Sequence, residues 1–229
     1  MKTKNFALLF TLFLFAGSLG FLAATSPNNV ALFWVIKNNV DRKPANQNWI
    51  KAKKGDLIYG GDYVRTQEKS FTLIKFNDAS TIRLGPSAEV QIYGDNNPSS
   101  MNINHGDVDF TMTKRKVGQF EFVTSTSVAS IRGTQGLLGV DANGTDFLTI
   151  IEGIVAFTNK ISNSTDTVTS GYTCISYKDG SITMHKSTQE DLDRVNQLIN
   201  EFLQQQHKLE MWFIGSDGKL HKITIETGQ

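Results

Sequence analysis

The chain has 229 residues, of which 39% are hydrophobic and 20% are charged, a composition typical of a folded globular protein. Its formal net charge is +1, without the basic excess of nucleic-acid-binding domains, so no nucleic-acid partner is expected. The single cysteine, Cys174, excludes an internal disulfide and a cysteine-based zinc site.

The first segment has the pattern of an export signal. Lys2 and Lys4 precede an uncharged apolar run over residues 6–24. We favour a cleaved signal peptide within residues 1–24, with Ala16-Gly17-Ser18 as a candidate cleavage site and Leu22-Ala23-Ala24 as a later option with a poorer residue at its first position. An uncleaved anchor in the inner membrane is the alternative, because the run approaches the ~20 residues that a transmembrane helix needs. Either way, we expect the rest of the chain to be exported, as a periplasmic or secreted protein of a bacterium.

Residues 30–182 read as a β domain. Short period-two runs such as Thr72-x-Ile74-x-Phe76 and Phe120-x-Phe122 alternate with turn residues, and no helical periodicity lies between them. An apolar strand, a glycine and a second apolar strand recur around Gly106 and Gly153, and more loosely around Gly171. This recurrence predicts a mainly β, solenoid-like or sandwich-like repetitive domain.

One amphipathic helix is expected over residues 187–208. Ser187 and Glu190 match a capping box at its start. An apolar stripe follows, made of Leu192, Val195, Ile199 and Phe202. The stripe either packs on the β domain or on the segment that follows, or it forms the face that binds a partner or a second copy.

A C-terminal β-hairpin is expected over residues 209–227. Leu209, Met211 and Phe213 alternate, Asp217-Gly218 makes the turn, and Ile223 and Ile225 alternate again. Because an isolated hairpin is marginal in water, it has to pack against something.

The titratable residues do not form a recognisable catalytic or metal-binding motif. None of the four histidines has a second histidine or a cysteine at ligand spacing. Asp107 and Asp109 share one strand face and could bind Ca²⁺ or share a proton, but a solvent-facing pair is the simpler interpretation. We therefore expect no catalytic residue, no cofactor and no metal, and a protein that is not an enzyme.

The stretch SIRGTQG, residues 130–136, is the most distinctive sequence motif in the chain. Glycines at positions 133, 136 and 139 suggest a phosphate loop, but such a loop needs a helix after it, and a strand pattern follows instead. We predict a corner between two strands at Gly133, with Arg132 holding loop carbonyls or a carboxylate such as Glu152.

Several ordered motifs resemble the extracytoplasmic FecR family domain. The words are Gly61-Asp62-Tyr63-Val64-Arg65-Thr66, Phe76-Asn77-Asp78-Ala79-Ser80, Ile131-Arg132-Gly133-Thr134 and Glu152-Gly153-Ile154-Val155. The positions that carry the resemblance, expected to be structural, are Trp49, Gly61, Asp62, Arg65, Thr66, Asp78, Ser80, Thr124, Arg132, Gly133, Thr134, Glu152 and Gly153. Asp78-Ala79-Ser80 departs from the family's usual Asp-Gly-Ser.

The resemblance implies a β-rich domain of the kind found in transmembrane anti-sigma regulators that receive a signal from an outer-membrane receptor. Five residues precede the apolar segment, so we expect the extracytoplasmic module without the cytoplasmic anti-sigma region. The favoured function is an exported binding, sensing or scaffold module with an envelope protein as partner. A membrane-anchored component of a sigma-factor regulatory system is the alternative, and an enzyme acting on envelope glycans is the third. The sequence leaves the partner and the oligomeric state open.

Overall fold

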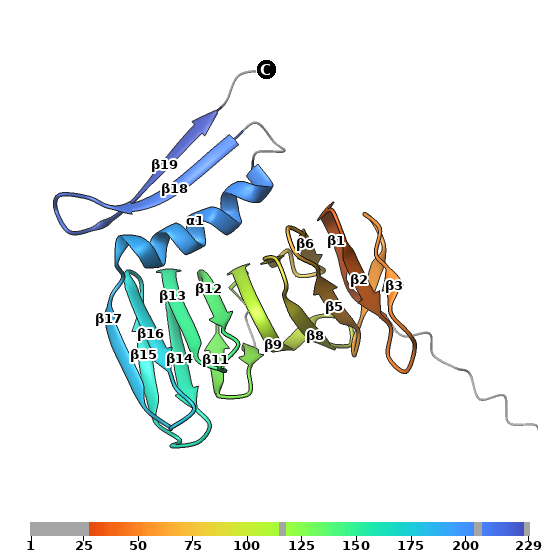
Figure 1. The fold of residues 1–229 in the computed structure, drawn as a ribbon, viewed down its shortest axis with the longest axis horizontal. Coiled ribbons are helices and arrows are strands. Elements are labelled where there is room, and N and C mark those ends of the chain that lie inside the picture. Colours follow the sequence, from red (N-terminus) through yellow and green to blue (C-terminus); the bar gives the residue numbers. More distant parts are fainter. Residues whose placement is uncertain (1–27, 115–117, 204–207, 227–229) are drawn as a thin grey trace, which may run out of the picture.

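The computed structural model describes residues 28–114, 118–203 and 208–226, arranged as a two-layered β structure with a helix and a hairpin on one side (Figure 1). The export signal predicted within residues 1–24 lies outside the described residues. One layer, called sheet A here, contains in spatial order β4 (Leu57–Tyr59), β1 (Asn29–Lys37), β6 (Phe71–Phe76), β7 (Thr81–Leu84), the second half of β9 (Pro98–Thr111), β12 (Gln135–Val140), β13 (Asp146–Glu152), β16 (Tyr172–Ser176) and β17 (Ile182–Lys186).

The other layer, sheet B, is built in the same way. It contains β3 (Ile50–Lys51), β2 (Val40–Lys43), β5 (Tyr63–Thr66), β8 (Glu89–Gly94), the first half of β9, β10 (Phe120–Val123), β11 (Ser127–Ile131), β14 (Ile154–Asn159) and β15 (Thr165–Thr169). From β10 onward the chain makes one hairpin in sheet B, then one in sheet A, and repeats. This confirms the predicted mainly β, repetitive, sandwich-like fold.

Strand β9 joins the two layers because it bends. Residues 98–105 pair with β8 in sheet B, and residues 106–111 pair with β12 in sheet A. Gly106, at the bend, has a φ of +96°, and an added Cβ would lie 2.5 Å from the Cα of Ala88. Glycine is therefore needed where the strand leaves one sheet for the other.

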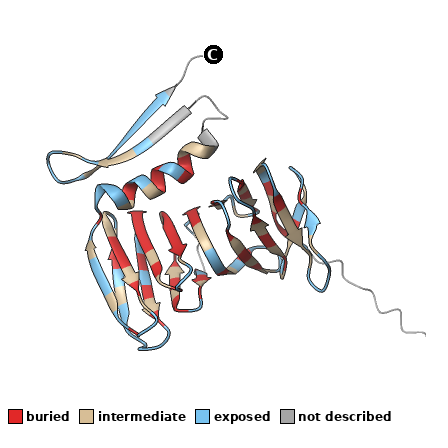
Figure 2. Ribbon diagram, viewed as in Figure 1, coloured by how far each residue is buried: buried red, intermediate tan, exposed pale blue. Residues whose placement is uncertain are grey.

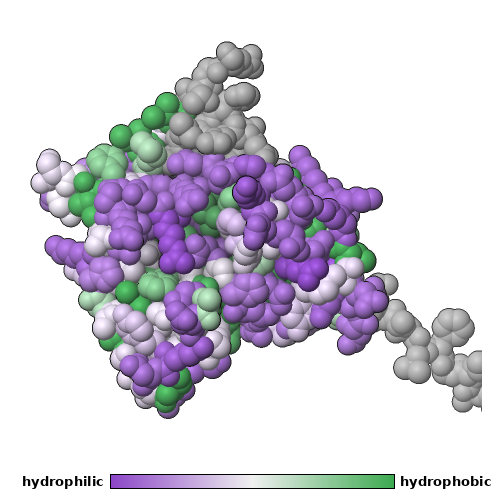
Figure 3. Space-filling model, viewed as in Figure 1, coloured by the Kyte–Doolittle hydropathy of each residue, from purple (hydrophilic) through white to green (hydrophobic). Residues whose placement is uncertain are grey.

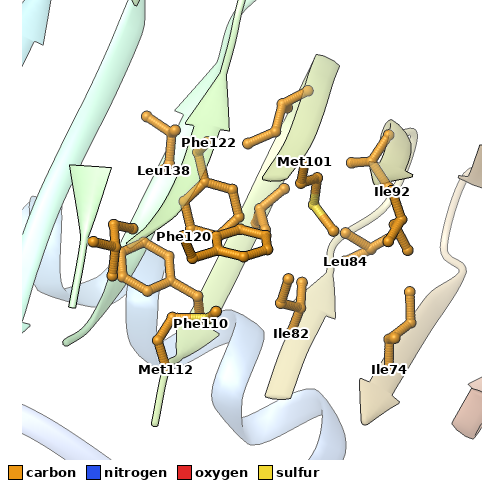
Figure 4. Packing of buried hydrophobic residues seen from close by; sticks show 14 of the residues in the cluster. Ile74, Ile82, Leu84, Ile92, Met101, Phe110, Met112, Phe120, Phe122 and Leu138 are labelled. Atoms are coloured by element: carbon orange, nitrogen blue, oxygen red, sulfur yellow. The ribbon is translucent and has the colours of Figure 1, made fainter. Parts of the chain in front are cut away.

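The inner faces of the two sheets form the main core. Phe110 of sheet A lies 4.9 Å from Phe122 of sheet B between ring centroids, and Phe76 lies 6.1 Å from Phe120. Ile74, Ile82, Leu84, Ile92, Met101 and Leu138 surround these rings (Figure 4). Alternation along each strand supplies one inward side chain in two, which is the pattern expected for a sandwich.

Helix α1 (Gln189–Leu203) follows β17 and lies against the outer side of sheet A, and the hairpin of β18 (Lys208–Ile214) and β19 (Leu220–Glu226) lies on α1 (Figure 1). The helix begins later than predicted. Thr188 is the N-cap: its Oγ1 accepts from Asp191 N (3.2 Å), and its own N–H donates to Asp191 Oδ2 (2.7 Å). Ser187, the predicted cap, instead shares a hydrogen bond with Thr173 in sheet A (2.9 Å).

Candidate partner-binding surface

The motif residues of the first half brace the strands from inside. Asp62 is 2% exposed, and its Oδ2 accepts from Arg42 Nε (2.7 Å) and from Tyr59 N (2.9 Å). Thr66 Oγ1 donates to Gly85 O (2.6 Å) and accepts from Ala88 N (2.9 Å). Asp62 ties the turn before β5 to β2 and β4, and Thr66 ties β5 to the turn before β8, so these residues act on the fold and present little to a ligand.

Trp49, Arg65 and Gly61 lie on or beside the outer face of sheet B. The Arg65 guanidinium lies 4.1 Å from the centroid of the Trp49 ring, and its Nε donates to Asp41 Oδ2 (3.0 Å). Gly61 has a φ of +92° where the chain passes from β4 to β5. These motif positions are half-buried and reachable from solvent, unlike Asp62 and Thr66.

The predicted corner at Gly133 lies between β11 and β12, beside a second corner at Gly153. A Cβ on Gly133 would lie 3.0 Å from the Cα of Lys114, and a Cβ on Gly153 would lie 3.0 Å from Gly133 O. Thr134, 2% exposed, lies in the same stack, and its carbonyl accepts from Met112 N (2.9 Å). The Arg-Gly-Thr and Glu-Gly motifs thus pack closely against each other where the chain passes between the sheets.

Arg132 and Glu152 flank this contact, and both are exposed. Their pairing stays a prediction. Thr124, the motif threonine after β10, is 4% exposed and donates to Asp146 Oδ2 (2.5 Å) while accepting from Ser127 N (2.7 Å). It links the tip of one hairpin in sheet B to the start of β13 in sheet A.

The turn with the unusual word Asp78-Ala79-Ser80 connects β6 and β7. Asp78 Oδ1 accepts from Ser80 N (3.0 Å), and the buried Ser80 Oγ accepts from Thr113 N (3.0 Å). Ala79 adopts a φ of +66°, the left-handed region that favours glycine. The turn keeps its shape with alanine, at some cost in backbone strain.

The apolar stripe of α1 packs on sheet A. Leu192, Val195 and Ile199 are at most 1% exposed and contact Leu137 and Ile151. The side chain of Phe202 lies outside what the structure describes. Of the two interpretations of this stripe, the geometry matches packing on the β domain, because three of its side chains are already covered.

Charged side chains fasten the helix to the sheet. Arg194 makes a bidentate contact with Asp107 (Nε–Oδ2 2.9 Å, Nη2–Oδ1 2.6 Å) above Gly139, where a Cβ would lie 2.4 Å from the Asp107 carboxylate. Near the other end of α1, Lys37 Nζ contacts Glu201 Oε2 (2.5 Å). Two ion pairs therefore hold α1 along its length.

Asp109 is not the solvent-facing residue that its spacing suggested. It is 0% exposed on the outer side of sheet A, where Arg83 of β7 donates to its Oδ1. Its Oδ2 and Arg83 Nε are buried without a hydrogen-bond partner. Burial raises the pKa of Asp109 more strongly than the Arg83 charge lowers it.

One side chain of α1 binds the hairpin through the two main-chain groups that a neighbouring strand would otherwise use. The Asn196 amide donates to Trp212 O (2.8 Å) and accepts from Trp212 N (2.8 Å). Trp212 and Leu220 pack against the buried cluster under α1. One face of the hairpin is thereby attached to the rest of the molecule.

The opposite face of the hairpin is apolar and open. Met211, Ile223 and Ile225 are 40%, 43% and 44% exposed, and Phe213 stacks on His221 with ring centroids 5.6 Å apart. Figure 2 shows the sandwich rich in buried residues and the described part of the hairpin without them. In Figure 3, hydrophobic side chains follow the outer rim of the hairpin, at upper left. Alternation in this segment was visible in the sequence, but which face would be covered was not.

The comparisons with known proteins agree with this fold. Residues 62–156 match the family model described as FecR protein, the family that the motifs resemble. No curated protein matches the chain. Two crystal structures of "a putative anti-sigma factor" from Parabacteroides distasonis are similar, each at 10% identity over 64% of this chain, with TM-scores of 0.50 and 0.49. The matched regions are 65% and 66% of those chains, less than two thirds of each, and at this identity the likeness shows the fold alone.

Two further observations concern the described residues alone. No helix among residues 28–114, 118–203 and 208–226 is long and apolar enough to cross a membrane. Within the same ranges, no three His, Cys, Asp or Glu side chains come together as a metal site would require.

Proposed function

We propose that the chain is an exported, non-catalytic FecR-type module that takes part in envelope signalling by binding a protein partner. The observation that carries the proposal is the open apolar face of the β18–β19 hairpin, formed by Met211, Phe213, Ile223 and Ile225. Contiguous exposed apolar side chains are unusual on a protein that works alone, and they typically mark an interaction site.

The hairpin suits a partner that offers an extended strand. It is a two-stranded sheet in which Asn196 occupies the edge of β18 at Trp212, and among the described residues the outer edge of β19 pairs with no further strand. Free strand edges accept an added strand through main-chain hydrogen bonds, and alternate side chains then give specificity. A partner strand with apolar residues at every second position would place them beside Ile223 and Ile225 and extend the apolar face while it completes the ladder.

Its attachment supports the same role. The hairpin is held by Asn196 and by the Trp212 and Leu220 contacts, on top of a helix fastened by Arg194 and Lys37. A partner would thus bind a surface whose orientation relative to the FecR domain is fixed. A module that senses a signal or acts as a scaffold needs such a fixed orientation.

The apolar run over residues 6–24 favours a second version, in which the module stays anchored in the membrane as part of a sigma-factor regulatory system. N-terminal sequencing of the mature protein separates the versions. A start near Leu19 or Thr25 supports the released module, and a start at Met1 or Lys2 supports the anchored one.

The partner site is tested by photo-crosslinking in the source cell. A photo-reactive residue at Ile225 is expected to give a discrete adduct with another envelope protein, and Ile223→Lys in the same chain should abolish it. The matched control places the probe at Ile154 and the charge at Ile161, both exposed isoleucines away from the hairpin. Equal adducts from both probe sites, or an adduct that survives Ile223→Lys, would refute the proposal.

A further inference from the structure

A hollow of about 290 Å³ opens on the outer face of sheet B, away from α1 and the hairpin, which lie on sheet A. It lies between strands β2, β5 and β8 and the loop after β2, and its lining includes Lys43, Asn46, Gln47, Gly61, Tyr63 and Gln91. The volume lies just below the ~300–1,000 Å³ range of small-molecule sites, so it suits one small ring or one unit of a chain.

The lining combines one aromatic ring with three amides. Gln91 is already oriented, because its Nε2 donates to Gly61 O (3.1 Å) and its Oε1 accepts from Tyr93 Oη (2.5 Å). Asn46 and Gln47 are exposed side chains at the rim. Amides that donate and accept beside an aromatic face are the groups that bind a sugar, because its hydroxyls need both functions and its C–H face is apolar.

The hollow also carries one cation without a counter-ion. Lys43 Nζ lies 4.3 Å from the Tyr63 ring centroid and 5.6 Å from that of Trp49. Among the described residues no carboxylate pairs with Lys43, whereas its neighbours Arg42 and Arg65 pair with Asp62 and Asp41. None of the lining residues is acidic. A ligand with a negative charge therefore gains a charge-assisted hydrogen bond that a neutral ligand does not.

We infer that this hollow binds an acidic glycan, a saccharide chain whose units bear carboxylates. One sugar ring would lie against Tyr63 in place of the Lys43 ammonium, which would turn from the ring to meet the sugar's carboxylate. The hydroxyls would meet Gln91 and the amides of Asn46 and Gln47. The site is independent of the partner face on the hairpin, so a protein partner and a glycan can be bound together. No bond is made or broken in this step, which is binding only.

Calorimetric titration of the full chain with polygalacturonate tests the inference, with dextran as the neutral glycan. Lys43→Met should weaken polygalacturonate binding at least about tenfold, and Gln91→Ala should weaken it comparably. The matched control is Lys75→Met, because Lys75 likewise lies over an aromatic ring, 4.7 Å from Trp34, in sheet A. Thermal melting verifies that each variant is folded.

The outcomes are distinct. Tight binding to the acidic glycan that falls with Lys43→Met and stays within about twofold with Lys75→Met supports the site. Equal losses for both lysine variants mean non-specific charge attraction and overturn it. Equal binding of dextran and polygalacturonate, or no binding of either, overturns it as well.

Discussion

Sheets A and B arise from the same alternation of hairpins, yet their outer faces differ. The outer face of sheet A is covered by α1, and there Leu137, Ile151 and even the charged Asp109 are buried. The outer face of sheet B carries half-buried and exposed polar or aromatic side chains, among them Tyr63, Gln91 and Thr167. The two sheets therefore share one backbone architecture, but the outer face of sheet A is covered by the helix and the outer face of sheet B is open to solvent.

The charges on the two faces differ accordingly. Arg83 and Asp109 on sheet A are 18% and 0% exposed, while Arg65 and Asp41 on sheet B are 35% and 18% exposed. A buried pair leaves an uncompensated charge when one partner is removed, and an exposed pair leaves a solvated one. The same substitution should thus have unequal effects on the two faces.

The largest expected effect comes from Arg83→Met. It should lower the free energy of unfolding by about 3–5 kcal/mol, because Asp109 then has no partner in the buried layer. Arg65→Met, the matched change on sheet B, should cost about 1 kcal/mol or less. Denaturant unfolding of both variants measures the contrast, and similar losses would show that the two faces are not electrostatically distinct.

The pH dependence of Arg83→Met sharpens this prediction. Because burial raises the pKa of Asp109 above 3.8 in the folded protein, the folded state takes up the proton first as the pH falls. The deficit should therefore be larger at neutral pH and shrink as the pH falls toward 4. The double variant Arg83→Met/Asp109→Leu should recover most of the loss at pH 7. A deficit that grows on acidification would contradict the assignment to Asp109.

The second prediction concerns the attachment of the β18–β19 hairpin to α1, on the outer side of sheet A. Asn196→Ala leaves the main-chain groups of Trp212 without their partners, and the loss should be about 1–3 kcal/mol for the local attachment of the hairpin. Hydrogen exchange should quicken in β18 and stay unchanged in β13. Asn104→Ala on the open sheet B, where the amide contacts Glu89, is the control and should be near neutral. Unchanged exchange in β18 would mean that the apolar contacts alone hold the hairpin.

Much of this arrangement was predictable from the sequence, because alternation and glycine punctuation are local signals. The runs around Phe120 and Phe122 and the corner at Gly133 follow from the period-two pattern and from the strand that continues after the glycines. The helix and the hairpin were equally visible, since their periodicities change abruptly after β17.

The contacts between distant segments could not be read in the same way. Asp109 alternates with apolar residues as a solvent-facing residue would, but it is buried on the outer side of sheet A, the side on which a helix that begins 80 residues later packs. Ser187 fits the capping pattern as well as Thr188 does, but Thr173 of sheet A bonds its hydroxyl. The aromatic hollow joins residues of three strands, which no single motif displays.

The smallest expected change in stability comes from the turn of a β-hairpin, and we compare one such turn in each sheet. Ala79, between β6 and β7 of sheet A, has a φ of +66°, and Asn163, between β14 and β15 of sheet B, has a φ of +58°. Asparagine tolerates this conformation, whereas alanine is strained by about 1–2 kcal/mol. Ala79→Gly should therefore raise the free energy of unfolding by about 0.5–1 kcal/mol, after the ~0.5–1 kcal/mol entropic cost of glycine. Asn163→Gly should change it little or lower it. Chemical denaturation decides between these, and a loss of stability in Ala79→Gly would show that the alanine methyl contributes packing that outweighs its strain.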